Sequence, residues 1–299
     1  MPIRSAIPLI LSLGLAALAL PAWAEPRLEE INRYVWSESF GDFGGLSGIE
    51  VTDGGDGFLA ISDRGTWLRA RVMRDGDGIS DVTVTARGPL LTTKGEPLDA
   101  RNVDAEGIAI APDGSIYVSY ESNHRVTRLR DIAAAPDLLP RHRDFPNLQN
   151  NSSLEALAVD AAGTVYTIPE RSGKLDRPFP VYRFRDGTWD KSLSVRREGR
   201  YLVSGADIGP DGKLYLLERD FTFLGGFTSR IRRFTLGPNG FDAGETLLTT
   251  SYGTYDNLEG ISVWQDDRGR LRLTLISDDN YSVFQQTQIV EFVLNEAGS

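Results

Sequence analysis

A strand–turn–strand pattern that recurs about every 50 residues constrains the fold of this chain most strongly. In its clearest copy an apolar segment follows Glu106, Pro-Asp-Gly makes a turn, and a second apolar segment, 116–120, ends at Glu121. Two strands joined by a tight turn form a hairpin, so both glutamates lie at the same end of it. We call the first place the opening position of the repeat and the second its exit position.

Four more copies of the hairpin align with the first. The opening positions are Ser47, Glu106, Glu155, Ala206 and Glu259, and the exit positions are Asp63, Glu121, Glu170, Glu218 and Asp278. Further strand-like segments fill each interval between repeats, which is typical of a β-propeller with one blade per repeat. The sequence therefore predicts an all-β fold, a single β-propeller of five blades. Six blades remain the alternative if the long first interval hides a divergent repeat.

The last repeat supplies only three strand-like segments. We expect residues 27–36, at the other end of the chain, to provide the fourth strand of that blade. This arrangement would close the ring and remove the unpaired strand edges that an open seam would leave.

Residues 1–24 have the pattern of a secretory signal peptide. A basic residue, Arg4, precedes the apolar segment 7–20, and Ala22-Trp23-Ala24 resembles a cleavage site. Residues 25–299 are then one exported propeller domain, periplasmic or secreted. No later segment approaches the roughly 18 consecutive apolar residues that a membrane span needs, so we predict no membrane insertion.

Composition narrows the chemistry. The chain has no cysteine, which rules out disulfides, thiolate metal sites and a thiol nucleophile. A net charge of −10 disfavours binding to nucleic acid. We expect a monomer, and we expect its partner to be a small anionic ester or another small molecule.

The predicted hairpins bring many carboxylates to one end of the central channel, which we call the mouth. Acidic side chains at strand ends often only satisfy turns, but five acidic exits in succession are harder to explain in that way. Converging carboxylates raise each other's pKa unless a positive charge shares the site. Arg64 and Arg219 follow two exits and supply part of that charge, and a hard cation such as calcium would supply the rest.

These considerations define the candidate residues. The candidate metal ligands are Asp63, Glu106, Glu121, Glu155, Glu170, Glu218, Glu259 and Asp278. The candidate catalytic residues are Glu106, Glu155, Arg64 and Arg219. A serine hydrolase is disfavoured because the chain has no Gly-x-Ser-x-Gly motif. His124 is the histidine near the predicted mouth, and no sequence motif pairs a serine with it.

Several segments resemble the family known as esterase-like activity of phytase, or the phytase-like domain. The segments that carry the resemblance are 43–49, 62–65, 104–108, 154–157, 217–220 and 257–261. The resemblance extends over nearly all of the chain after the signal peptide, and it implies a secreted or periplasmic propeller with acidic residues at its centre.

Two hypotheses about function remain open. The first is a metal-dependent hydrolase of phosphate or other esters, with calcium at the mouth. The second is a non-catalytic periplasmic propeller that binds a small ligand, a cation or an envelope protein.

Overall fold

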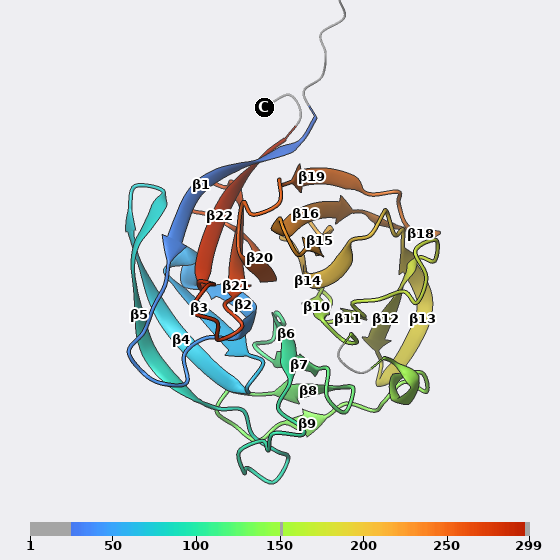
Figure 1. The fold of residues 1–299 in the computed structure, drawn as a ribbon. Coiled ribbons are helices and arrows are strands. Elements are labelled where there is room, and N and C mark those ends of the chain that lie inside the picture. The colour runs from blue at the N-terminus through green and yellow to red at the C-terminus, as the bar shows by residue number, and fades with distance from the viewer. Residues whose placement is uncertain (1–24, 150–151, 297–299) are drawn as a thin grey trace, which may run out of the picture.

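The computed structural model describes residues 25–149 and 152–296, so the predicted signal peptide lies outside the described residues. The described strands form five four-stranded sheets in a ring around a central axis, with no α-helix among these residues (Figure 1). This is a five-bladed β-propeller; it confirms the predicted fold and excludes the six-bladed alternative. In this part of the chain no helix is long and apolar enough to cross a membrane.

Each blade has four antiparallel strands, which are described here in order from the central axis outward. The innermost strands are β2 (Leu46–Thr52), β6 (Ala105–Ile110), β10 (Ala156–Val159), β14 (Leu202–Ile208) and β20 (Asn257–Gln265). The second strands are β3 (Gly57–Ser62), β7 (Ile116–Tyr120), β11 (Val165–Ile168), β15 (Leu214–Thr222) and β21 (Leu271–Asp278). Blades 1 to 5 follow this order.

The outer strands complete the blades. The third strands are β4 (Thr66–Asp75), β8 (Arg125–Leu129), β12 (Phe179–Arg185), β16 (Gly226–Phe234) and β22 (Gln288–Asn295). The outermost strands are β5 (Gly78–Pro89), β9 (Asp137–Leu138), β13 (Thr188–Val195), β19 (Glu245–Thr249) and β1 (Arg27–Val35). The small additions are the pair β17 (Leu236–Gly237) and β18 (Gly240–Phe241), and the 3₁₀ turns η1 (Asp53–Gly55) and η2 (Phe145–Asn147).

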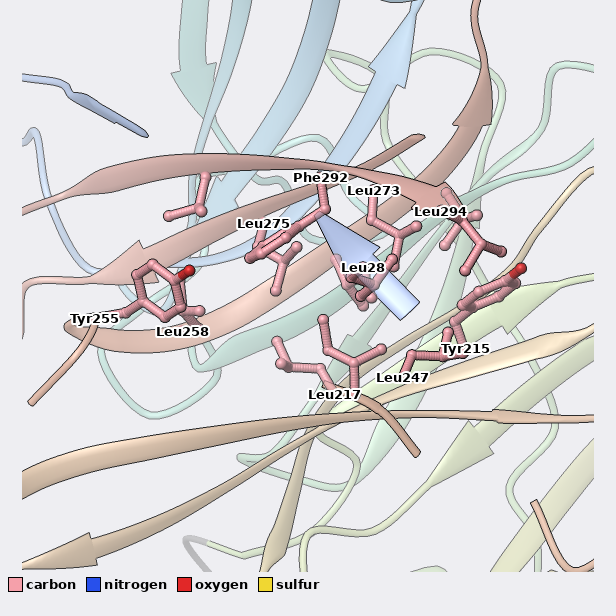
Figure 2. Packing of buried hydrophobic residues seen from close by; sticks show 14 residues of the cluster. Leu28, Tyr215, Leu217, Leu247, Tyr255, Leu258, Leu273, Leu275, Phe292 and Leu294 are labelled. Carbon is pink, nitrogen blue, oxygen red and sulfur yellow. The ribbon is translucent and has the colours of Figure 1, made fainter. Parts of the chain in front are cut away.

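Blade 5 is closed by the first strand of the chain, as predicted. β1 pairs antiparallel with β22 from Arg27 opposite Asn295 to Val35 opposite Gln288. Figure 2 shows Leu28 of β1 among buried apolar side chains of β15, β21 and β22. Burying a leucine stabilises a fold by about 1.5–3 kcal/mol, so this strand contributes packing as well as hydrogen bonds.

The strand register corrects two positions of the sequence repeat. In β2, β14 and β20 the pairing skips one residue, a β-bulge, and the skipped residues are Ser47, Ser204 and Glu259. The opening position of blade 4 is therefore Ser204, and assigning it to Ala206 was wrong. Ser47 and Ser204 make the same contact, because each hydroxyl donates to a carbonyl oxygen directly before a glutamate of a neighbouring blade.

The strand register also moves the exit position of blade 4 by one residue. Asn257, two residues before the opening position of blade 5, pairs with the exit residue Asp278. In blade 4 the residue two before Ser204 is Leu202, which pairs with Arg219. Arg219 therefore occupies the exit position that the sequence comparison gave to Glu218.

The innermost strands approach one another closely through glycines. A Cβ atom on Gly205 would lie 2.3 Å from the carbonyl oxygen of Glu259, which belongs to the backbone of the next blade.

Replacing Gly205 by alanine is expected to lower the free energy of unfolding by about 1–3 kcal/mol, because the two backbones must move apart. Urea denaturation measures the change. The control is Gly237→Ala, where the nearest atom to the added Cβ lies 3.7 Å away. Equal losses in the two variants would contradict the close approach of β14 and β20.

Candidate metal centre at the propeller mouth

Three glutamates at opening positions lie around the channel. Glu106, Glu155 and Glu259 are buried and line a central cavity of about 10 Å³ together with Ser47 and glycines of the innermost strands. A cavity of this size holds about one water molecule. A ligand larger than water therefore cannot pass between these three glutamates, and it has to bind at the open end of the mouth.

Asp104 joins two of the predicted residues in a compact group. Carboxylate oxygens of Asp104, Glu106 and Glu121 all lie within 4.8 Å of one another. The hairpin holds them together, since the Glu121 amide donates to the Asp104 carbonyl at 2.9 Å. Sequence reasoning omitted Asp104, although its position two residues before Glu106 was a signal, because such residues tend to share a face of a strand.

The donor set suits a hard divalent cation. Three carboxylates are the ligand type that calcium and magnesium prefer. The group contains no histidine, and the chain has no cysteine, so it lacks the donors typical of structural zinc sites. These residues can hold a metal ion.

The carboxyl groups around the mouth repel one another when they are ionised. Burial and the neighbouring carboxylates raise the pKa of Glu106 well above its ordinary value. Burial also raises the pKa of Glu121 to about 7, with Asp104 and Glu170 adding to the shift. A cation would relieve this repulsion, because it stabilises the ionised carboxylates.

The other side of the mouth shows the same effect. Burial and the charge of Glu259 raise the pKa of Asp278 to about 8 and that of Asp63 to about 6. Burial raises the pKa of Glu155 well above its ordinary value, against the opposing influence of Arg219. Asp63 and Asp278 thus belong to the acidic mouth, as predicted from their exit positions.

Arg219 places one positive charge inside this acidic group. Its guanidinium forms an ion pair with Glu259, donates to Asn257 Oδ1 at 2.8 Å and lies 3.4 Å from Glu170 Oε1. These carboxylates raise its pKa further above the ordinary arginine value, against the effect of burial. The predicted Arg219 is therefore part of the mouth, where it bridges blades 3, 4 and 5.

Glu218 lies outside the group, whereas Arg64 acts on it through its charge: burial raises the pKa of Asp63, and the charge of Arg64 partly opposes this shift. Arg64 is exposed, and its guanidinium stacks 3.2 Å from the ring centroid of Tyr281. Glu218 is fully buried, and its carboxylate accepts hydrogen bonds from Arg230 at 2.8 Å and from Arg232 at 2.7 Å. Glu218 therefore neutralises arginines within blade 4 instead of joining the predicted ligands.

Ser153 contacts both His124 and Glu121. His124 Nδ1 and Ser153 Oγ are 2.7 Å apart, and the Ser153 amide donates to Glu121 Oε1 at 2.7 Å. Ser153 is 0% exposed, which leaves its hydroxyl without an open approach for a substrate. The Ser153 amide positions the Glu121 carboxylate. Sequence reasoning missed Ser153 because no local motif links it to His124.

The metal-free protein is expected to lose stability as the pH rises. Asp63, Glu121 and Asp278 have pKa values of about 6, 7 and 8 in the folded state, well above their ordinary values near 4. The folded state therefore binds more protons than the unfolded state between these limits, and its advantage, complete at low pH, is lost as the pH rises.

Urea denaturation in EDTA at pH 5 and pH 8.5 measures this effect. Asp278→Asn should make the fall shallower, since it removes one of the raised pKa values. A stability that increases from pH 5 to pH 8.5 would contradict the electrostatic description of the mouth.

One sequence family and several solved structures are similar to this chain. The sequence model of a family described as "Phytase-like: Esterase-like activity of phytase" matches residues 41–281. No curated protein matches the chain in sequence. The PQQ-bound form of aldose sugar dehydrogenase from Streptomyces coelicolor is similar in structure, with 13% identity, a TM-score of 0.52 and coverage of 90% of this chain and 100% of that one.

A second solved structure has comparable similarity. The catalytic domain of the GH62 α-L-arabinofuranosidase from Coprinopsis cinerea shares 10% identity at a TM-score of 0.50, covering 92% of this chain and 98% of that one. At such identities the likeness concerns the fold alone.

Proposed function

Because the chain belongs to the phytase-like family, we propose that it is an exported, calcium-dependent hydrolase of phosphate or other esters. The observation that carries the proposal is the close grouping of Asp104, Glu106 and Glu121 at the mouth of the propeller. Export to the periplasm or the medium is inferred from the signal-peptide pattern of residues 1–24.

Each residue at the mouth has a separate role in the proposed hydrolysis. Asp104, Glu106 and Glu121 would hold the calcium ion, which when bound supplies a Lewis acid for the ester oxygen and promotes ionisation of water. Glu155 is the candidate general base, because it lines the same central cavity as Glu106, next to the proposed ion. Arg219 holds Glu259 and Glu170 in place and balances their charge.

The small central cavity favours one competing function. Glu106, Glu155 and Glu259 are each less than 10% exposed, and the cavity between them holds about one water molecule. A cation held between these glutamates would have no room for a substrate beside it, and its role would be to stabilise the propeller. The propeller would then bind a small ligand or an envelope protein without catalysis.

Turnover with and without metal separates the two functions. The purified protein is assayed on nitrophenyl phosphate, phosphodiester and carboxylate esters, first in EDTA and then across a calcium titration. We expect hydrolysis of at least one ester class that appears with calcium and disappears with EDTA. Calcium that raises the melting temperature while no ester is hydrolysed would establish the non-catalytic function.

A further inference from the structure

A second cavity, of about 440 Å³, lies at the mouth end of blade 3. The loop 171–178 forms one wall, and residues 144–148 form another. Arg171, Arg177 and Lys191 line this cavity beside the side chain of Ser172. In a chain with a net charge of −10, three cationic side chains around one cavity reverse the charge locally.

Part of this positive charge is already neutralised. Lys191 forms an ion pair with Asp144 in the opposite wall, and Arg171 Nε lies 3.1 Å from Glu170 Oε2. Arg177 is different, since within the described ranges no carboxylate oxygen lies within 4.0 Å of its guanidinium nitrogens. Its side chain is exposed and lines the cavity.

A fourth arginine lies behind the cavity wall. Arg197 Nη1 donates to Ser172 Oγ at 2.9 Å, and Arg197 Nε is buried without a hydrogen-bond partner. Burial, and then the like charge of Arg171, hold the pKa of Arg197 below its ordinary value. An anion in the cavity would relieve the repulsion between these arginines.

The cavity is connected to the mouth by direct contacts. Arg171 pairs with Glu170, and Glu170 Oε1 lies 3.4 Å from Arg219, which in turn pairs with Glu259. A ligand that occupies the cavity therefore lies next to the acidic mouth.

We propose that this cavity binds an anionic group of the substrate, a phosphate, sulfate or carboxylate remote from the ester that is cleaved at the mouth. The role in substrate binding rests on the proposed function, whereas binding of the anion itself does not require turnover. Arginine recognises such oxyanions with two parallel hydrogen bonds, and the volume is within the range of small-ligand sites.

Binding of inorganic phosphate tests the anion site directly. The titration is followed by calorimetry in EDTA, so that no metal at the mouth can bind the phosphate. We expect saturable binding that Arg177→Gln weakens about tenfold or more, since a hydrogen bond to a charged group is lost. Lys94→Gln removes a positive charge elsewhere and should bind as the unmodified protein does, because Lys94 does not line the cavity. The absence of saturable binding, or unchanged binding by Arg177→Gln, would overturn the proposal.

A pair of substrates separates this proposal from the proposed function. If esters are hydrolysed, Arg177→Gln should raise KM for an ester that carries a second anionic group, without changing KM for its neutral counterpart. Equal KM changes for both esters would overturn the subsite role. If no ester is hydrolysed but phosphate binding still depends on Arg177, the anion site stands and the hydrolase proposal fails.

Discussion

Replacing Glu106 by glutamine is expected to reduce calcium-dependent ester hydrolysis at least about a hundredfold. Glu106 belongs both to the group with Asp104 and Glu121 and to the ring of glutamates around the central cavity. Its loss removes a ligand from the proposed ion and a negative charge from the centre of the mouth. The assay is turnover of the best ester substrate at saturating calcium.

The fold should tolerate this substitution. The raised pKa of Glu106 favours its protonated form in the metal-free protein, and glutamine resembles that form in shape and charge. Calcium at a hundred times its dissociation constant should stabilise the unmodified protein by about 2.7 kcal/mol, and Glu106→Gln should lose most of this gain. The melting temperature with and without calcium measures the difference.

Glu50→Gln is a matched control. Glu50 is also a buried glutamate on an innermost strand, with a pKa raised well above its ordinary value by burial and by Asp207. It lies farther along β2 from the mouth, where Ser262 Oγ is 3.3 Å from its carboxylate. If Glu50→Gln and Glu106→Gln lose turnover and calcium stabilisation equally, the mouth is not the metal site.

The sequence repeat was enough to predict the propeller because it has a strong physical cause. Each hairpin needs a turn and two apolar strands, so turn residues and alternating apolar residues mark the blades even where the other residues differ. The missing fourth strand of blade 5 followed from counting, and β1 fills that place.

The site was harder to predict because its positions depend on β-bulges. A bulge adds a residue without changing the residue types nearby. An alignment guided by acidic residues therefore chose Ala206, which Asp207 follows, and Glu218, and both places were wrong. The hydrogen-bonded register puts Ser204 and Arg219 there instead. Contacts between distant loops, such as His124 with Ser153, have no periodic signal in the sequence at all.

This shifted register explains how so many carboxylates can share one mouth. With Glu218 at the exit of blade 4 the ring of exit residues would be entirely acidic, whereas the structure places Arg219 between Glu170 and Glu259. The mouth therefore carries its own counter-charge on one side and groups Asp104, Glu106 and Glu121 together elsewhere.

Replacing Arg219 by methionine should accordingly destabilise the metal-free protein by about 3–5 kcal/mol at pH 8, because it leaves buried carboxylates without their cation. The loss should be smaller at pH 5, where protonation of Glu121 and Asp278, with pKa values of about 7 and 8, reduces the repulsion. Calcium should restore part of the stability at pH 8, since it supplies positive charge to the same group of carboxylates. Urea denaturation at both pH values, with EDTA or calcium, measures each of these effects.

Arg64→Met is the control for removal of an arginine near the mouth. Arg64 is exposed and stacks on Tyr281, so its replacement should cost less than about 1 kcal/mol at either pH. A similar small loss for Arg219→Met would mean that Glu170 and Glu259 are neutralised by protons or by solvent. The charge of the mouth would then be balanced without Arg219, and calcium would have to displace protons from these carboxylates in order to bind.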